Sequence, residues 1–176
     1  MTPRDEVVRP GEDGAPPVGR TAWQVVRAVA VASAAAFAGG GLLTQTVTVP
    51  YWQAMKPAAF LTSFATYGPA TGATLFPIEL LAIVLLGLVV YSTVRSGEPG
   101  RLVWIGALLC MVATALLLPL YFAGANNGFI SRTIAENDVA TALRTWSAWN
   151  WARTGLAFLA VALGSIGLGY RVNNRD

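Results

Sequence analysis

The chain has 176 residues, of which 55% are hydrophobic and only 12% are charged, with a formal net charge of +3. A soluble domain usually has about 25% charged residues, so this composition excludes an ordinary soluble fold and indicates a membrane protein. The basic residues are scattered and form no cluster interleaved with aromatic residues, which argues against nucleic acid as a partner. The chain has one cysteine, Cys110, and no histidine, so an intramolecular disulfide is excluded and the usual Cys/His metal spacing is missing.

The first part of the chain predicts a tail, a membrane span and a loop. Residues 1–21 mix Pro, Gly and charges of both signs, a composition typical of a disordered N-terminal tail. The first predicted span covers residues 25–47, and its three consecutive glycines at 39–41 would let another helix approach closely. Residues 49–71 are expected to form a long apolar loop at the membrane interface or packed against the helices.

Three further spans follow, and they complete a membrane domain of residues 22–171, with 172–176 as a short C-terminal tail. The turn at 95–101 is rich in Gly and Pro and predicts an antiparallel hairpin, whereas 124–137 is polar and is expected to be irregular. A long helix is expected to start near Asp138 and to continue into the last span. About 20 apolar residues cross roughly 30 Å of hydrocarbon, so the sequence predicts an all-α, four-helix transmembrane bundle. These spans cover residues 72–94, 102–122 and 151–170.

The distribution of positive charge predicts the orientation of the bundle. With a cytoplasmic N-terminus, eight arginines lie on the inner side: Arg4, Arg9, Arg20, Arg27, Arg95, Arg101, Arg171 and Arg175. Four basic residues then lie on the outer side: Lys56, Arg132, Arg144 and Arg153. Because basic residues accumulate on the cytoplasmic side, we expect a multi-pass protein of the cell membrane with both termini in the cytoplasm.

Polar residues gather at one end of this predicted bundle. The antiparallel order brings together the end of span one, the start of span two, the end of span three and the start of span four. Those segments contain Gln45, Glu79, Asn126, Asn127, Asn150 and Arg153. Polar groups that converge in an apolar cavity are typical of a small-molecule site, so we predict an outward-facing polar pocket.

Glu79 and Arg153 are the most informative of these residues, and each has two interpretations. A charge at the bilayer centre costs about 2.5–3.5 kcal/mol on insertion scales, so Glu79 should face the interior with a partner, and Arg153 is the cation at similar depth. Glu79 is either a general base or proton carrier, or half of a structural ion pair. Arg153 either stabilises an anion or extends to the interface between two tryptophans. Trp146, Asn150 and Arg153 share one helical stripe, so all three can point into the bundle.

Two motifs resemble a known family. Residues 121–127 read Tyr-Phe-Ala-Gly-Ala-Asn-Asn, and residues 146–154 read Trp-Ser-Ala-Trp-Asn-Trp-Ala-Arg-Thr. Together with the Gly-rich first span, they resemble the anthrone oxygenase-like family of small four-helix membrane proteins, over roughly residues 28–170. The chain departs from that pattern in two ways: it has no proline just before the paired asparagines and no histidine near the arginine motif.

The resemblance implies an oxygenase that needs neither metal nor flavin. An acidic CH between aromatic rings would lose a proton to Glu79, and the carbanion would react with O₂. Arg153 and Asn150 would stabilise the enolate, while Tyr121, Trp146 and Trp149 would stack on a flat polycyclic substrate.

Other functions stay open beside this one. A non-enzymatic membrane protein would bind a lipid, a quinone or a partner protein through the glycine face at 39–41 and the loop at 49–71. A transporter or channel would need more than four spans with one acid, which a homo-oligomer could supply.

Overall fold

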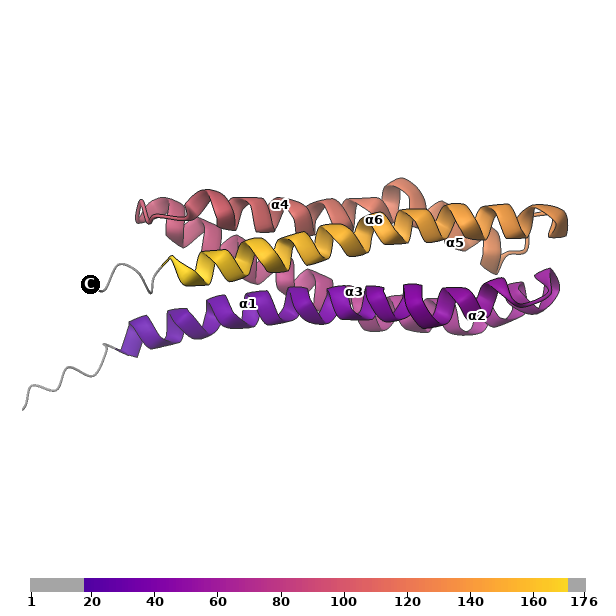
Figure 1. The fold of residues 1–176 in the computed structure, drawn as a ribbon, viewed down its shortest axis with the longest axis horizontal. Coiled ribbons are helices and arrows are strands. Elements are labelled where there is room, and N and C mark those ends of the chain that lie inside the picture. The colour runs from indigo at the N-terminus through magenta and orange to yellow at the C-terminus, as the bar shows by residue number, and fades with distance from the viewer. Residues whose placement is uncertain (1–17, 171–176) are drawn as a thin grey trace, which may run out of the picture.

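The computed structural model describes residues 18–170, and within that range the protein is an all-α bundle of four long antiparallel helical segments. Both ends of the described chain lie at the same end of the bundle, here named the terminal end, and the opposite end is the far end (Figure 1). Most of the predicted N-terminal tail and the tail at 172–176 lie outside the described residues. Residues 18–21, which the sequence placed in the tail, are already helical.

The four segments are built from helices separated by short interruptions. The first contains α1 (Val18–Leu43), the π-helical turn η1 (Thr44–Thr48) and α2 (Val49–Gln53). The second is α3 (Pro57–Arg95). The third contains α4 (Arg101–Leu117), the π-helical turn η2 (Leu118–Phe122) and α5 (Ala123–Ile130), and the fourth is α6 (Glu136–Gly169). All four are long and apolar enough to cross a membrane, which confirms the predicted fold class.

The segments are longer than the predicted spans because two sequence-predicted irregular regions are largely helical. The prediction of a loop at 49–71 is wrong, because only three residues separate α2 from α3. Pro57 occupies the first turn of α3, where its missing N–H costs no hydrogen bond. The irregular segment expected at 124–137 is helical as α5 up to Ile130. The long helix expected from Asp138 into the last span is confirmed as α6.

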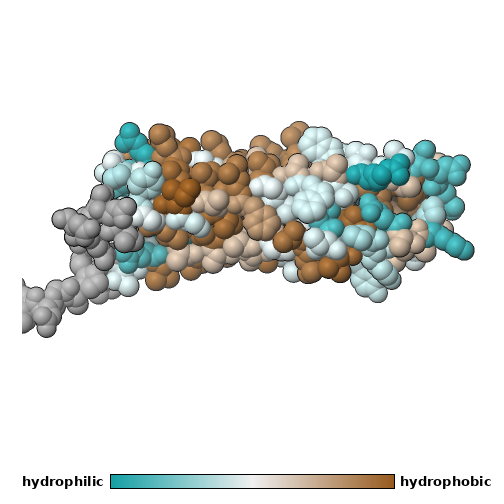
Figure 2. Space-filling view, in the orientation of Figure 1, coloured by the Kyte–Doolittle hydropathy of each residue, from teal (hydrophilic) through white to brown (hydrophobic). Residues whose placement is uncertain are grey.

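Most of the exposed large apolar side chains form a belt of limited height around the bundle, and Tyr51, Tyr67 and Ile130 are exposed beyond it toward the far end. On each segment the belt runs between two residues, Val25 and Val47, Phe76 and Val94, Leu102 and Leu120, and Trp149 and Tyr170. At 1.5 Å per residue, each stretch is roughly 30 Å long, which matches the hydrocarbon thickness of a bilayer. The far end extends beyond this belt and has a more hydrophilic surface (Figure 2).

Two cores of different composition fill the bundle. Inside the belt the core is rich in small residues, among them Ala30, Ala34, Ala38, Ala82, Ala107, Ala157 and Ala160. At the far end the core is aromatic, with Trp52, Phe60, Phe64, Phe122, Phe129 and Trp146 packed at centroid distances of 5.0–6.3 Å. Small residues let helices approach closely in lipid, whereas burial of aromatic rings drives packing where water is present.

The turn between α3 and α4 is the predicted hairpin. Gly97 and Gly100 have φ values of +63° and +84°, a left-handed backbone that glycine adopts without strain. Arg27 of α1 donates to Glu98 of this turn at 2.7 Å and lies over the ring of Trp104, with the Cζ atom 5.8 Å from the centroid. This pair of a buried arginine and a half-buried glutamate links α1 to the turn at the terminal end.

Candidate functional site

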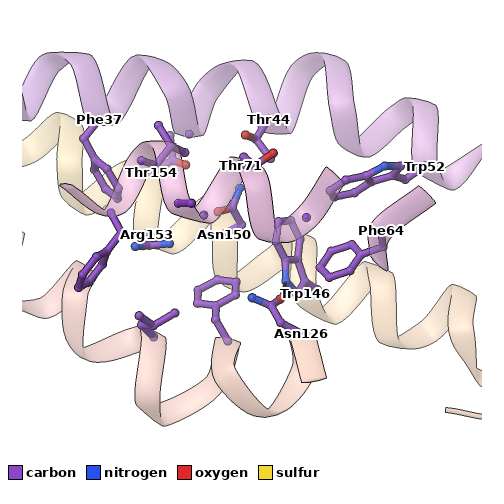
Figure 3. Close-up of a pocket in the computed structure, with 18 residues that line it drawn as sticks. Phe37, Thr44, Trp52, Phe64, Thr71, Asn126, Trp146, Asn150, Arg153 and Thr154 are labelled. Atoms are coloured by element: carbon purple, nitrogen blue, oxygen red, sulfur yellow. Dashed lines mark hydrogen bonds between the residues drawn. The ribbon is translucent and has the colours of Figure 1, made fainter. Parts of the chain in front are cut away.

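A cavity of about 350 Å³ lies where the two cores meet, at the far rim of the apolar belt. All four segments contribute to its walls (Figure 3). The aromatic part of the lining comprises Phe37, Trp52, Phe64, Phe76, Phe122 and Trp146, and the polar part comprises Thr44, Thr71, Asn126, Asn150, Arg153 and Thr154. The cavity is therefore mostly apolar with a few polar groups, as small-molecule sites usually are.

Two π-helical turns lie at the level of the cavity and supply part of its wall. In η1, Val49 donates to the carbonyl of Thr44, and in η2, Ala123 donates to the carbonyl of Leu118. Pro50 follows η1 and Pro119 lies within η2, and a proline cannot donate to the regular helical ladder. The wider turns accommodate this loss. Such π-turns are frequent at functional sites.

Glu79 and Arg153 form an ion pair between α3 and α6. Arg153 Nη2 donates to Glu79 Oε2 at 2.6 Å, and the hydroxyl of Thr114 on α4 lies 2.7 Å from Glu79 Oε1. Glu79 is 0% exposed and Arg153 is 16% exposed. Both carboxylate oxygens thus have a partner. The charge of each member is balanced within the bundle, which offsets its large desolvation cost.

Two aromatic rings cover the guanidinium of Arg153. Its Cζ atom lies 4.9 Å from the ring centroid of Phe37 on α1 and 5.5 Å from that of Phe122 in η2. Cation–π contacts of this kind fix the plane of the guanidinium as well as its position. Arg153 is therefore held by three other segments of the chain.

Several polar atoms at the cavity lack a hydrogen-bond partner. Among the described residues, five buried side-chain nitrogen or oxygen atoms have no partner in the protein, and three of them belong to cavity-lining residues: Asn150 Nδ2, Arg153 Nε and Thr154 Oγ1. Asn150 is 7% exposed and Thr154 is 3% exposed. A buried polar group without a partner costs about 1–3 kcal/mol, so three such atoms on α6 make this wall a costly part of the bundle.

Four of the residues predicted from sequence line this cavity: Asn126, Trp146, Asn150 and Arg153. The predicted stripe of Trp146, Asn150 and Arg153 does face the interior of the bundle. Trp146 also donates through Nε1 to Asn126 Oδ1 at 2.8 Å, which links the two resemblance motifs directly. Glu79 does not line the cavity but lies behind Arg153.

The other predicted residues have different surroundings. Gln45 is buried but pairs with Ser147, donating to its carbonyl at 2.6 Å and accepting from its hydroxyl at 3.1 Å. Tyr121 and Trp149 stack on each other at 5.4 Å and 30°, with Trp149 exposed in the apolar belt. Asn127 is exposed, and its carbonyl accepts from Ser131. None of these four lines the cavity.

Sequence reasoning missed most of the aromatic wall and all three threonines of the lining. Thr44 and Thr71 donate to the carbonyls of Gly40 and Tyr67 in their own helices, a local bond that many membrane threonines make. The nearest signal in the sequence was the glycine run that includes Gly41, because it indicates a close approach of another helix. In the structure a Cβ added at Gly41 would lie 2.7 Å from Thr154 Oγ1. This close approach of α1 and α6 places Thr154 at the cavity.

Comparisons with known proteins gave no relative: no family model, no curated protein and no solved structure matches the chain. Within residues 18–170 there is also no group of three or more His, Cys, Asp or Glu side chains that could hold a metal ion.

Proposed function

We propose that the protein binds a flat, lipid-soluble molecule with a neutral acceptor oxygen, such as a ring carbonyl, in the cavity at the rim of the apolar belt. The observation that carries this proposal is the set of unpartnered polar atoms in Asn150, Arg153 and Thr154. Two of them are N–H donors, which need an acceptor. The third is a hydroxyl, which can donate or accept.

The charge balance of the site favours a neutral ligand over an anion. Glu79, at 2.6 Å, already neutralises the charge of Arg153. The carboxylate of an anionic ligand would therefore enter an apolar cavity without a free counter-ion. The oxygen of a neutral carbonyl can instead accept two hydrogen bonds without bringing an unpaired charge into the cavity. Hydrogen bonds to charged donors contribute about 1.5–3 kcal/mol, more than neutral ones.

The size and walls of the cavity support a ring system as the apolar part. Its volume of about 350 Å³ is within the usual range for small-molecule sites. Phe37, Phe64, Phe122 and Trp146 all contribute to the lining, and aromatic side chains favour stacked or edge-to-face contacts with a flat ligand. A bulky lipid headgroup has no comparable match here.

A matched pair of probes tests the proposal: 9,10-anthraquinone and anthracene, which share a three-ring skeleton and differ in the two carbonyl oxygens. Binding to the protein in lipid nanodiscs is measured by quenching of tryptophan fluorescence. We expect anthraquinone to bind more tightly. We further expect Asn150→Leu to weaken anthraquinone binding by about tenfold, the value of one hydrogen bond, without affecting anthracene.

Asn127→Leu is the control, because Asn127 is an exposed asparagine outside the cavity lining. Equal affinities of the wild-type protein for both probes would contradict the role of the acceptor oxygen. Loss of affinity in the Asn127 variant equal to that in the Asn150 variant would show that the effect is not local to the cavity.

The resemblance to the anthrone oxygenases supports a second candidate, oxidation of an anthrone-like ligand in the same cavity. The specific observation in its favour is that Asn150 and Arg153, each with an unpartnered N–H donor, line the same mostly apolar cavity, where such donors could stabilise an enolate oxygen. In balance, the ring methylene gives up two hydrogens and gains one oxygen, and one O₂ yields the carbonyl and one water. For Glu79 to take the first proton, the ion pair must open, because the carboxylate does not line the cavity.

Uptake of O₂ with anthrone distinguishes the two candidates. An oxygenase consumes O₂ faster in the wild-type protein than in Arg153→Ala, Asn150→Leu or Glu79→Gln. Equal uptake by wild type and the Arg153 variant would exclude catalysis and leave the binding proposal in place.

We also propose that the protein belongs to the cell membrane with both termini in the cytoplasm. At the terminal end of the described chain, Arg95 and Arg101 are exposed beside the α3–α4 turn. The cavity would then face the outer leaflet.

A further inference from the structure

The fully exposed residues of the cavity lining belong to one segment only. Of the residues that line the cavity, those exposed at the surface are Gly72, Ala73 and Phe76, all within two turns of α3. Phe76 is 45% exposed, whereas the lining residues of the other three segments are buried or half-buried. The mouth of the cavity therefore lies beside α3.

The wall of α3 is thin at this place. Gly68 and Gly72 have no side chain there, and a Cβ added at position 72 would meet no atom within 4 Å. Two prolines inside the helix, Pro69 and Pro77, flank the stretch. Pro77 has no N–H to donate to the carbonyl of Ala73, so the helix lacks a hydrogen bond at the mouth itself.

Along the axis of the bundle, packed side chains lie on both sides of the cavity. Toward the far end, Trp52, Phe60, Phe64 and Phe129 are buried and packed against one another in the aromatic core. Toward the terminal end, the alanine-rich core fills the interior, and the pair of Arg27 and Glu98 lies beyond it.

The height of the mouth relates it to the bilayer. Apart from Tyr67, Phe76 is the exposed large apolar residue of α3 nearest the far end, and the exposed residues next to it in that direction are Thr74, Ala73 and Gly72. The mouth thus lies at the rim of the belt, where hydrocarbon meets headgroups. Molecules with an apolar ring system and a polar oxygen concentrate in that layer, as the side chains of Trp and Tyr do.

We infer that the ligand reaches the cavity sideways from the interfacial layer of the bilayer, through the mouth formed by Gly72, Ala73 and Phe76, and that the ligand is a membrane-dissolved aromatic amphiphile. This inference rests on the proposed binding function and adds the source and the route of the ligand. Such a molecule would bind beside Asn150 and Thr154, which are buried and line the cavity.

Exchange of a fluorinated probe between bilayer and cavity tests the route. The protein is placed in bicelles with 2-fluoroanthraquinone, and ¹⁹F exchange spectroscopy gives the exchange rate and the affinity in one sample at equilibrium. Gly72→Leu narrows the mouth. We expect it to lower the rate at which the probe associates with the cavity by about tenfold. Phe76→Ala widens the mouth and is expected to raise the exchange rate.

Gly155→Leu is the matched control. Gly155 is an exposed glycine of α6, outside the cavity lining, and a Cβ there also meets no atom within 4 Å. This variant is expected to exchange like the wild type. Exchange by Gly72→Leu at the wild-type rate, or weaker binding with an unchanged association rate, would overturn the lateral route while the binding proposal stands. Failure of the wild-type protein to bind the probe would overturn the binding proposal and the route with it.

Discussion

Arg153 has two tasks that compete for the same guanidinium. Its Nη2 neutralises Glu79, which a buried acid needs, while its Nε has no partner in the protein and belongs to a residue of the cavity wall. A lysine could not do both, because its single ammonium has no fixed fork of donors. The rings of Phe37 and Phe122 keep the guanidinium in the plane that serves both tasks.

A double-mutant cycle checks the contribution of this ion pair to stability. Removing one member of a buried pair leaves an unpaired charge and typically costs about 3–5 kcal/mol, so Glu79→Gln and Arg153→Met should each lower the thermal midpoint in detergent strongly. The double variant has no unpaired charge and should regain most of the loss. Additive losses in the double variant would show that the two residues do not interact.

Much of the cavity could be predicted at the level of single residues, and the failures have identifiable causes. The stripe of Trp146, Asn150 and Arg153 follows from helical periodicity, and pairing with Glu79 follows from the cost of charge in a membrane. Gln45 was expected beside them, but it sits in η1, and its amide is used by Ser147. The periodicity of a regular helix does not apply in a π-helical turn, so it could not predict that Thr44 would line the cavity.

At the scale of helices, hydropathy finds the part of each segment that lies in lipid and misses the part beyond it. The far half of α3 contains Pro57, Gly68 and Pro69, which favour a loop in sequence. In the structure Pro57 starts the helix, and the rest of the stretch stays helical because Phe60 and Phe64 are buried in the aromatic core. Tertiary packing overrides the local signal, and no pattern in α3 alone reports the rings of α2, α5 and α6.

The glycine run of α1 offers a test of helix packing with a built-in control. An added Cβ at Gly41 would lie 2.7 Å from Thr154 Oγ1, whereas one at Gly39 would meet no atom within 4 Å. Gly41→Leu is therefore expected to destabilise the bundle by about 1–3 kcal/mol through overpacking, with a lower thermal midpoint in detergent.

Gly39→Leu should leave the midpoint unchanged or raise it, because leucine is the better helix former. Loss of a function in Gly39→Leu without loss of stability would instead favour the alternative that this face of α1 contacts a partner protein. Equal destabilisation of both variants would contradict the packing described for α1 and α6.

At the scale of the whole molecule, one continuous bundle has lipid around its apolar belt and water around its far end. The alanine-rich core lies within the apolar belt, and the aromatic core lies at and beyond its far rim, where burial from water drives packing. The number of spans and their antiparallel order could be predicted, since both depend on hydropathy and turn residues. The helical structure beyond the belt could not, because it depends on contacts between distant segments.

Labelling of engineered cysteines tests both the belt and the orientation. In a Cys110→Ala background, a membrane-impermeant maleimide applied to intact cells is expected to label Ala59→Cys, an exposed site at the far end. Val84→Cys, half-exposed in the middle of the belt, should stay unlabelled from either side because lipid covers it. Ser96→Cys, in the turn after α3, should react only in inverted vesicles. The opposite pattern for positions 59 and 96 would reverse the orientation and leave the belt intact.

The ion pair also constrains the order in which the protein can be assembled during translation. Glu79 enters the bilayer with α3, and its cation is made 74 residues later. At synthesis rates of about 5–20 residues per second, Arg153 is synthesised roughly 4–15 s after Glu79. Thr114 arrives sooner, 35 residues after Glu79, and can contact the carboxylate in the meantime. Insertion of α6 therefore completes the cavity wall and supplies the cation for Glu79 in a single step. A nascent chain that stops before α6 keeps an unpaired charge, which quality control can recognise.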